Sequence, residues 1–290
     1  MDDSAALTGI TVITLAVNLP GPLAAARLTA MGARVIKVEP PSGDPLQHAA
    51  PQYYRELAAH QEVMVLDLKT DSDRATLDSL AAGAHVLLTS MRPRAAESLG
   101  LPSLVERHGL VHVEIVGFNG DRADVPGHDL TYQAAHGSLV PGTMPTVPIA
   151  DILGGERAVT AGLAGLRQRE QDPAGTSGGI VQRVALDDAA HWAAGMARHG
   201  LTSPGAHLGG GSPFYQTYAT ADGHIAIGAV EPHFASTVGQ MIGSDHDTLT
   251  RAFAARPTQT WMELAHTHDL PIEPILNPSA PRLDHPGATS

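Results

Sequence analysis

Short runs of apolar residues recur through the first two thirds of the chain, and segments with helical spacing separate them. The runs predict six buried strands, at residues 10–15, 33–39, 63–68, 85–89, 110–116 and 180–186. The segments between them predict helices or helical turns at residues 23–31, 71–82, 95–99, 103–108, 130–137 and 152–169. Strands that alternate with helices in this way predict an α/β fold, in which a largely parallel, Rossmann-like sheet forms a large domain.

The pattern changes in the last third of the chain. A predicted helix at 187–199 leads into residues 203–213, which are rich in Gly, Ser and Pro and are the best linker candidate. Two strand-like segments then flank Asp222-Gly223, a dipeptide typical of a hairpin, and three further helices follow them. We therefore expect a large domain over residues 1–185, a helix and linker over 186–213, a small α+β domain over 214–276 and a loose tail over 277–290.

Composition and charge exclude several classes of protein. Hydrophobic residues make up 43% of the chain, which is too apolar for a disordered protein. The formal net charge is −12, from 30 acidic and 18 basic residues, so no uninterrupted basic patch is expected to neutralise a nucleic acid. The chain has no cysteine, which excludes a disulfide scaffold, Cys-ligated zinc and a cysteine nucleophile.

The sequence also bears on location. Its N-terminus begins acidic and carries only a short apolar run, unlike a signal peptide, and no run of about 18 apolar residues is present. Together with the missing cysteines, this predicts a cytoplasmic protein without a membrane partner.

Several familiar catalytic motifs are absent. The first predicted strand is not followed by G-x-G-x-x-G, and no G-x-x-x-x-G-K-[ST] occurs, which disfavours nicotinamide Rossmann enzymes and P-loop NTPases. The 16 histidines form no H-E-x-x-H motif, so no metal site is predicted. No G-x-S-x-G nucleophile elbow is present either.

Four polar residues remain as candidates for chemistry. His128 and Asp129 follow a predicted strand and a loop, which places them at the carboxyl edge of the sheet, where ligands bind in α/β proteins. Asp151 directly precedes the helix predicted at 152–169, and in isolation it is best interpreted as an N-cap. Glu231 precedes Pro232 at a helix start, and in isolation it is best interpreted as a solvated acid.

Taken together, these residues resemble the class III CoA-transferase family, also called CaiB/BaiF, and within it the α-methylacyl-CoA racemase branch. The resemblance runs from Leu7 to about Pro274. The segments VIKVEPP and DLK mark the family, whereas GHD and GAVEP mark the racemase branch. The longer segments that carry it are residues 21–45, 65–88, 92–101, 127–137 and 209–234.

The resemblance implies the CoA-transferase family III fold and a particular chemistry. In the racemases, the positions of His128 and Asp151 are the two acid/base groups, and the position of Glu231 pairs with the histidine. The implied reaction inverts the α-carbon of a 2-methyl-branched acyl-CoA by proton transfer through an enolate. In the family's transferases the position of Asp129 is instead a nucleophile that carries CoA as an aspartyl thioester.

The resemblance also implies how substrate and subunits are arranged. CoA enters as part of the substrate, no prosthetic group is needed, and Lys37, Arg92 and the loop at Pro40 would contact its nucleotide or phosphates. Amide groups at the chain turn of His128-Asp129 and at the helix start after Asp151 would stabilise the enolate oxygen. A homodimer is expected, for which the family offers an interlocked arrangement, with Glu231 of a small domain facing the site.

Two departures from the family pattern keep other functions open. Basic residues usually precede the VLDLK segment, but here residues 60–62 read His-Gln-Glu. The sequence also stops soon after the segment LPIEPIL, which weakens the expectation of full interlocking. The alternatives are therefore a class III CoA-transferase that uses Asp129, and a non-catalytic acyl-CoA-binding paralogue.

Overall fold

A computed structural model describes residues 5–172 and 178–276 and divides the chain into two compact units. The first unit comprises residues 1–195 and the second residues 196–290. Each is described by itself below.

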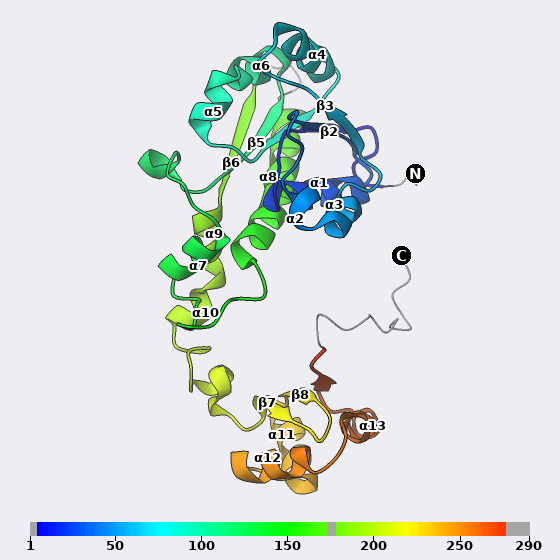
Figure 1. Ribbon diagram of the computed structural model, residues 1–290, viewed down its shortest axis with the longest axis vertical. Coiled ribbons are helices and arrows are strands. Elements are labelled where there is room, and N and C mark those ends of the chain that lie inside the picture. Colours follow the sequence, from blue (N-terminus) through cyan, green and yellow to red (C-terminus); the bar gives the residue numbers. More distant parts are fainter. Residues whose placement is uncertain (1–4, 173–177, 277–290) are drawn as a thin grey trace. The chain divides into compact units, whose positions relative to one another are not determined.

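The first unit is built on a six-stranded sheet with the order β3-β2-β1-β4-β5-β6 (Figure 1). All five neighbouring pairs are parallel, and Val12 of β1 lies between Val35 of β2 and Val86 of β4. The strands are β1 (Thr11–Thr14), β2 (Arg34–Glu39), β3 (Glu62–Val65), β4 (Val86–Thr89), β5 (Val111–Val116) and β6 (Ile180–Ala185). This order is that of a Rossmann-type sheet, so the predicted α/β class is confirmed.

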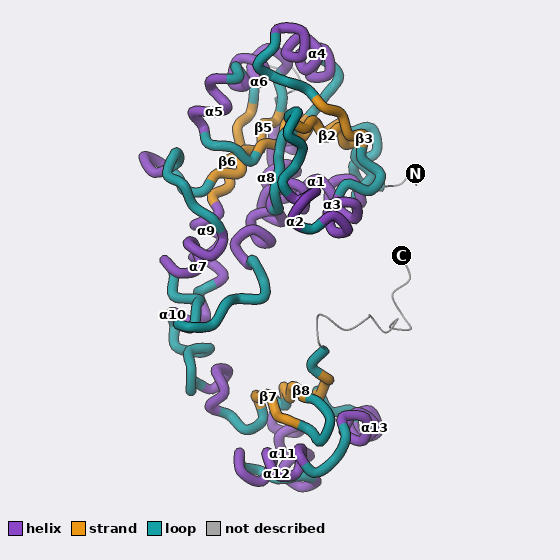
Figure 2. The backbone as a smooth tube through the Cα atoms, viewed as in Figure 1, coloured by secondary structure: helices purple, strands orange, loops and turns teal. Residues whose placement is uncertain are grey.

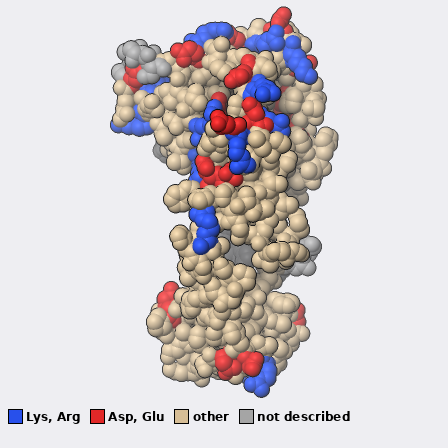
Figure 3. All heavy atoms as spheres, turned by 90° about the vertical axis from the view of Figure 1, so that its left-hand side faces the viewer, with Lys and Arg blue, Asp and Glu red and all other residues tan. Residues whose placement is uncertain are grey.

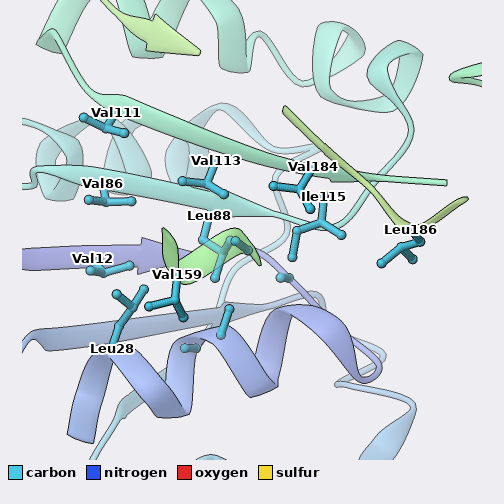
Figure 4. Packing of buried hydrophobic residues seen from close by; sticks show 14 of the residues in the cluster. Val12, Leu28, Val86, Leu88, Val111, Val113, Ile115, Val159, Val184 and Leu186 are labelled. Carbon is cyan, nitrogen blue, oxygen red and sulfur yellow. The ribbon is translucent and has the colours of Figure 1, made fainter. Parts of the chain in front are cut away.

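Helices cover both faces of this sheet, as the strands and helices of Figure 2 show. On one face, α1 (Pro20–Ala30) and α8 (Ile149–Glu170) pack against side chains of the central strands. Figure 4 shows this cluster, in which Leu28 and Val159 meet strand residues such as Val12. On the other face lie α4 (Asp71–Ala81), α5 (Pro93–Ser98) and α6 (Leu101–His108). Strands buried on both sides contain continuous apolar runs, which is why the sequence pattern located them.

The packing of α1 on α8 depends on small residues. A Cβ added at Gly155 of α8 would lie 2.9 Å from the carbonyl oxygen of Pro20 and 3.1 Å from Cβ of Leu23. The backbones of the two helices can approach closely only because this position has no side chain. The second turn of α8 is thereby fixed against the first turns of α1.

Four smaller helices complete the first unit, and a fifth, α10, lies at its boundary with the second unit. They are α2 (Leu46–Ala49), α3 (Pro51–Leu57), α7 (Asp129–Ala135), α9 (Leu186–Ala193) and α10 (Gly195–Arg198). We did not predict α2 and α3, and the single helix predicted at 187–199 is two helices. Because α9 packs against α7 and α8, it belongs to the first unit, and not to the linker to which we assigned it.

The second unit holds a three-stranded antiparallel sheet, β7 (Tyr215–Ala219), β8 (His224–Gly228) and β9 (Ile272–Pro274). The predicted hairpin around Asp222-Gly223 is present, whereas β9 was not predicted. A one-turn π-helical segment, His207–Gly211, precedes the sheet. The helices α11 (Pro232–Met241), α12 (His246–Ala254) and α13 (Thr258–His268) form a core with the sheet around Phe253 and Trp261. The predicted tail, 277–290, lies outside the described residues.

The surface of the first unit carries charges of both signs. On the face shown in Figure 3, Lys and Arg side chains lie among Asp and Glu side chains. Among the helices of the described residues, none combines the length and the apolar character needed to cross a bilayer.

Candidate active site

Two adjoining pockets lie at the carboxyl edge of the parallel sheet. The first, called the central pocket below, has a volume of about 240 Å³. Its walls include Asn18, Arg92, Gly117, His128, Tyr132 and Asp151. The second, called the apolar pocket, has a volume of about 520 Å³. Its walls include Pro40, Pro41, Leu66, Leu68, Lys69 and Leu99.

The loops after β1 and β4 join the two pockets. Val17, Ser90 and Met91 line both of them. The strands that follow β1 along the chain are added on one side of it (β2 and β3), and those from β4 onward are added on its other side. Ligands of open α/β sheets bind at such a switch point, here between β1 and β4. The position of the pockets therefore follows from the topology.

The helix start after β1 is unsuited to a dinucleotide phosphate. Pro20 and Pro22 occupy the first and third positions of α1, so two of the amides that usually bind a pyrophosphate are missing. Gly21 is packed so closely that an added Cβ would lie 2.1 Å from Cβ of Ala16. This helix start therefore serves packing.

Asp129 caps a helix that starts twenty residues later. Its Oδ1 accepts hydrogen bonds from the amides of Ala150 at 2.7 Å and Asp151 at 3.2 Å. Its Oδ2 accepts a bond from Nε2 of Gln133 at 2.6 Å, and both side chains are buried. Oδ1 of Asp129 is thus engaged at the N-terminus of α8, where the helix dipole favours a negative charge, and Oδ2 is engaged by Gln133 of α7.

This arrangement corrects our interpretation of Asp151 as an N-cap. The helix begins at Ile149, the N-cap position is Pro148, and Asp151 lies inside the first turn. The cap comes from Asp129, so the side chain of Asp151 is not needed for it. In the described residues, the Asp151 carboxylate has no hydrogen bond or ion pair of its own, and it lines the central pocket.

Burial, and after it the negative charge of Asp129, raises the pKa of Asp151 to about 7. A carboxyl group with this pKa is divided between its two protonation states near neutral pH, as a group that both gives and takes protons requires. His128 lines the same pocket from the N-cap position of α7, and its side chain is exposed. The starts of α7 and α8 therefore bring an imidazole and a partly buried carboxyl group to one pocket.

The amides that we expected to stabilise an enolate oxygen are mostly occupied. Those of Ala150 and Asp151 donate to Asp129, and that of Ile152 donates to the carbonyl oxygen of Pro148. The amide of His128 donates to Oγ1 of Thr131 at 3.0 Å. The expectation that the α8 start supplies these donors is therefore wrong, because the Asp129 carboxylate and the carbonyl oxygen of Pro148 already accept their hydrogen bonds.

The residues predicted to contact CoA fall into different environments. Pro40 lines the apolar pocket, and Arg92 is exposed and lines the central pocket. Lys37, in contrast, is buried: its Nζ lies 2.7 Å from Oδ2 of Asp44 and 3.5 Å from Oε1 of Glu39. A phosphate cannot reach an ammonium enclosed in this way, so the predicted contact from Lys37 is not supported, and the ion pairs instead hold the loop after β2.

The structure adds one cation that we had not assigned. Lys69 is exposed and lines the apolar pocket, although we had used the DLK segment only as a family marker. Glu62, in the segment where the family carries basic residues, starts β3 and pairs with Arg34 at 2.7 Å. It lies at the opposite end of β3 from the loop that carries Lys69.

Glu231 belongs to the second unit. It is exposed and occupies the N-cap position of α11. Its pairing with His128 stays a prediction. Among the described residues, no cluster of three or more His, Asp or Glu side chains is arranged to hold a metal ion.

Comparison with known proteins supplies the family. The sequence model of CoA-transferase family III matches residues 7–288. The chain belongs to CoA-transferase family III.

Relatives within family III include both racemases and transferases. The chain is 29% identical to human alpha-methylacyl-CoA racemase, over 93% of this chain and 78% of that protein. It is 31% identical to cinnamoyl-CoA:phenyllactate CoA-transferase of Clostridium sporogenes, over 78% of this chain and 61% of that protein. A crystal structure of a hypothetical protein from Mycobacterium tuberculosis superposes with a TM-score of 0.75 at 26% identity, over 92% of this chain and 84% of the other.

A family III structure from Brucella suis, described as a CAIB/BAIF protein, has a TM-score of 0.77 at 22% identity, over 94% of this chain and 84% of the other. It confirms the fold. The family consists of enzymes that act on CoA substrates, and its relatives perform two different reactions.

Proposed function

We propose that this chain is an acyl-CoA racemase that inverts the α-carbon of a 2-methyl-branched acyl-CoA. The observation that carries the proposal is that His128 and Asp151 line one pocket while the neighbouring Asp129 is committed to capping α8. One imidazole and one carboxyl group with a pKa of about 7 are a suitable pair of acid/base groups.

In the proposed reaction, the α-carbon of the thioester lies between the two groups. In one direction the Asp151 carboxylate takes the α-proton, and the electron pair of the C–H bond moves to form an enolate. Protonated His128 then gives a proton to the opposite face, which leaves a neutral imidazole and a neutral carboxyl group. The reverse direction exchanges the two roles, so both enantiomers are substrates.

The adjoining pockets offer a place for CoA. We propose that the pantetheine arm runs from the apolar pocket past Ser90 and Met91 into the central pocket. Lys69 and Arg92 are the exposed cations on these walls and would attract the phosphates. We further propose that Glu231 pairs with His128 in a homodimer, as the resemblance to the racemase branch implies.

The chief alternative is CoA transfer through Asp129, which the named transferases among the relatives support. A nucleophilic carboxylate needs an oxygen that faces the thioester carbonyl. Both oxygens of Asp129 instead accept hydrogen bonds from Ala150, Asp151 and Gln133. This geometry favours the racemase, because nucleophilic attack would first have to break the cap of α8.

The test is to incubate the protein in D₂O with each enantiomer of a 2-methylacyl-CoA, with and without acceptor carboxylic acids. The proposal predicts inversion with incorporation of one deuterium and no need for an acceptor. Transfer of CoA to an acceptor acid, together with a covalent adduct on Asp129 seen by mass spectrometry, would refute it. Binding of the acyl-CoA without exchange or transfer would instead identify a non-catalytic paralogue.

A further inference from the structure

Tyr132 is a buried polar side chain on the wall of the central pocket that the proposed reaction does not yet use. It lies in the second turn of α7, and 1% of the residue is exposed. Within residues 5–172 and 178–276, no other group forms a hydrogen bond with its hydroxyl. A hydroxyl that lines a ligand pocket and has no protein partner is free to donate to a ligand there.

The position of the ring is tightly defined. A Cβ added at Gly117 would lie 2.5 Å from the Tyr132 hydroxyl oxygen, and one added at Gly127 would lie 2.6 Å from it. Both glycines line the central pocket, so the phenol lies in a slot that any larger residue at these positions would close. Phe118 packs edge-on against the same ring, with centroids 5.2 Å apart. The hydroxyl is therefore preorganised, as a group that stabilises a developing charge has to be.

The electrostatic demand in this pocket is specific. When the α-proton leaves, the C–H electron pair is delocalised onto the thioester oxygen, which becomes negative. The amides of Ala150, Asp151 and His128 are already engaged with protein acceptors. Among the described residues, the amide of Asp129 at the start of α7 has no protein acceptor and can serve as one donor, and a side chain that faces the pocket can supply a second.

We propose that the Tyr132 hydroxyl donates a hydrogen bond to the thioester oxygen of the substrate and stabilises the enolate. This inference rests on the proposed racemase function. No covalent bond to Tyr132 forms or breaks, and the phenol keeps its proton throughout the reaction. The moving protons belong to the α-carbon, Asp151 and His128.

The electrostatics of the phenol agree with this role. Burial, followed by the negative charges of Asp151 and Asp187, raises the pKa of Tyr132 to about 12. The hydroxyl thus stays protonated over the working pH range and acts as a donor.

The test is Tyr132→Phe, which removes the hydroxyl and leaves the ring in its slot. Removal of one oxyanion donor typically lowers kcat by about 10²–10³-fold, so we expect a loss of that size with KM changed by less than about threefold. The matched control is Tyr218→Phe, which removes a hydroxyl from another mostly buried ring, one bonded to the carbonyl oxygen of Pro213. We expect the control to exchange the α-proton at the rate of the unmodified protein.

A second measurement separates a chemical role from a structural one. Fluorinated tyrosine inserted at position 132 keeps the ring and lowers the pKa of the phenol. We expect a new alkaline limb in the pH profile of kcat, because the donor is lost when the phenol ionises. A profile without this limb would overturn the inference, whether or not Tyr132→Phe folds.

The two proposals fail in different ways. If the unmodified protein exchanges the α-proton and Tyr132→Phe does so at the same kcat, only the role of Tyr132 is refuted. If the unmodified protein does not exchange the α-proton at all, the racemase proposal fails and this inference fails with it.

Discussion

Replacement of Asp129 by asparagine tests how the site sets the acidity of Asp151. The amide oxygen of the new side chain can still accept hydrogen bonds from the amides of Ala150 and Asp151, so the two hydrogen bonds that cap α8 are retained. What disappears is one negative charge beside Asp151, together with the acceptor that Oδ2 of Asp129 offers to Nε2 of Gln133. Because that charge disfavours ionisation of Asp151, its removal lowers the pKa of Asp151.

The size of the effect follows from the causes of the shift. The pKa of Asp151 is raised from 3.8 to about 7, and burial is the larger cause, with Asp129 second. Asp129 therefore accounts for less than half of a rise of roughly 3, so we expect a fall of about one pKa unit, or about 1.4 kcal/mol.

The assay is the rate of α-proton exchange in D₂O as a function of pH. For the enantiomer whose α-proton Asp151 takes, the acid limb that reports ionisation of Asp151 should move from near pH 7 to about one unit lower in Asp129→Asn. The control is Asp124→Asn, because Asp124 is exposed and accepts a hydrogen bond from the amide of Arg94. An unmoved limb in a folded Asp129→Asn variant would refute the electrostatic argument.

Three further predictions concern stability. Asp44→Ala leaves the buried ammonium of Lys37 without its partner at 2.7 Å, and we expect urea unfolding to show that the free energy of unfolding falls by about 3–5 kcal/mol. The added change Lys37→Met should restore most of that loss. Equal losses in the single and double variants would contradict this prediction. Burial lowers the pKa of His112 below its usual 6.5, so the unfolded chain binds more protons there, and the contributed stability is present above pH 6.5 and declines as the pH falls below it. Thermal unfolding at a series of pH values should show a smaller decline for His112→Gln, and an unchanged slope would speak against this assignment. Gly155→Ala places a Cβ 2.9 Å from a carbonyl oxygen of α1 and should destabilise the fold by about 1–3 kcal/mol. In the control Gly162→Ala, the nearest atom lies 3.7 Å from the added Cβ, so this variant should keep the stability of the unmodified protein. Chemical denaturation of both variants measures the difference.

The sheet was predictable because its strands are buried on both faces and therefore form continuous apolar runs. The elements that we missed bury little. Within α2 and α3, Leu57 is the buried residue, and β9 has three residues that include Pro274. Local apolar periodicity does not reveal such segments.

The site was predictable in its residue types and not in its contacts. His128 and Asp151 were assigned from the resemblance to the racemase branch, and both line the central pocket. The cap that Asp129 gives to α8 joins residues more than twenty positions apart, so no local pattern reveals it. The same holds for Lys37, whose family motif does not show that the fold encloses its ammonium beside Asp44. Tyr132 fits an ordinary helical position, and only the two facing glycines make its hydroxyl conspicuous.

The most direct test of the central claim is stereochemical. Each enantiomer of a 2-methylacyl-CoA is incubated separately in D₂O with the unmodified protein, His128→Ala and Asp151→Asn, and the hydrolysed acids are analysed by chiral chromatography and mass spectrometry. If the two groups act on opposite faces of one carbon, the unmodified protein inverts both enantiomers with uptake of one deuterium, and neither variant inverts either of them. Inversion by His128→Ala or Asp151→Asn at the rate of the unmodified protein would contradict the account.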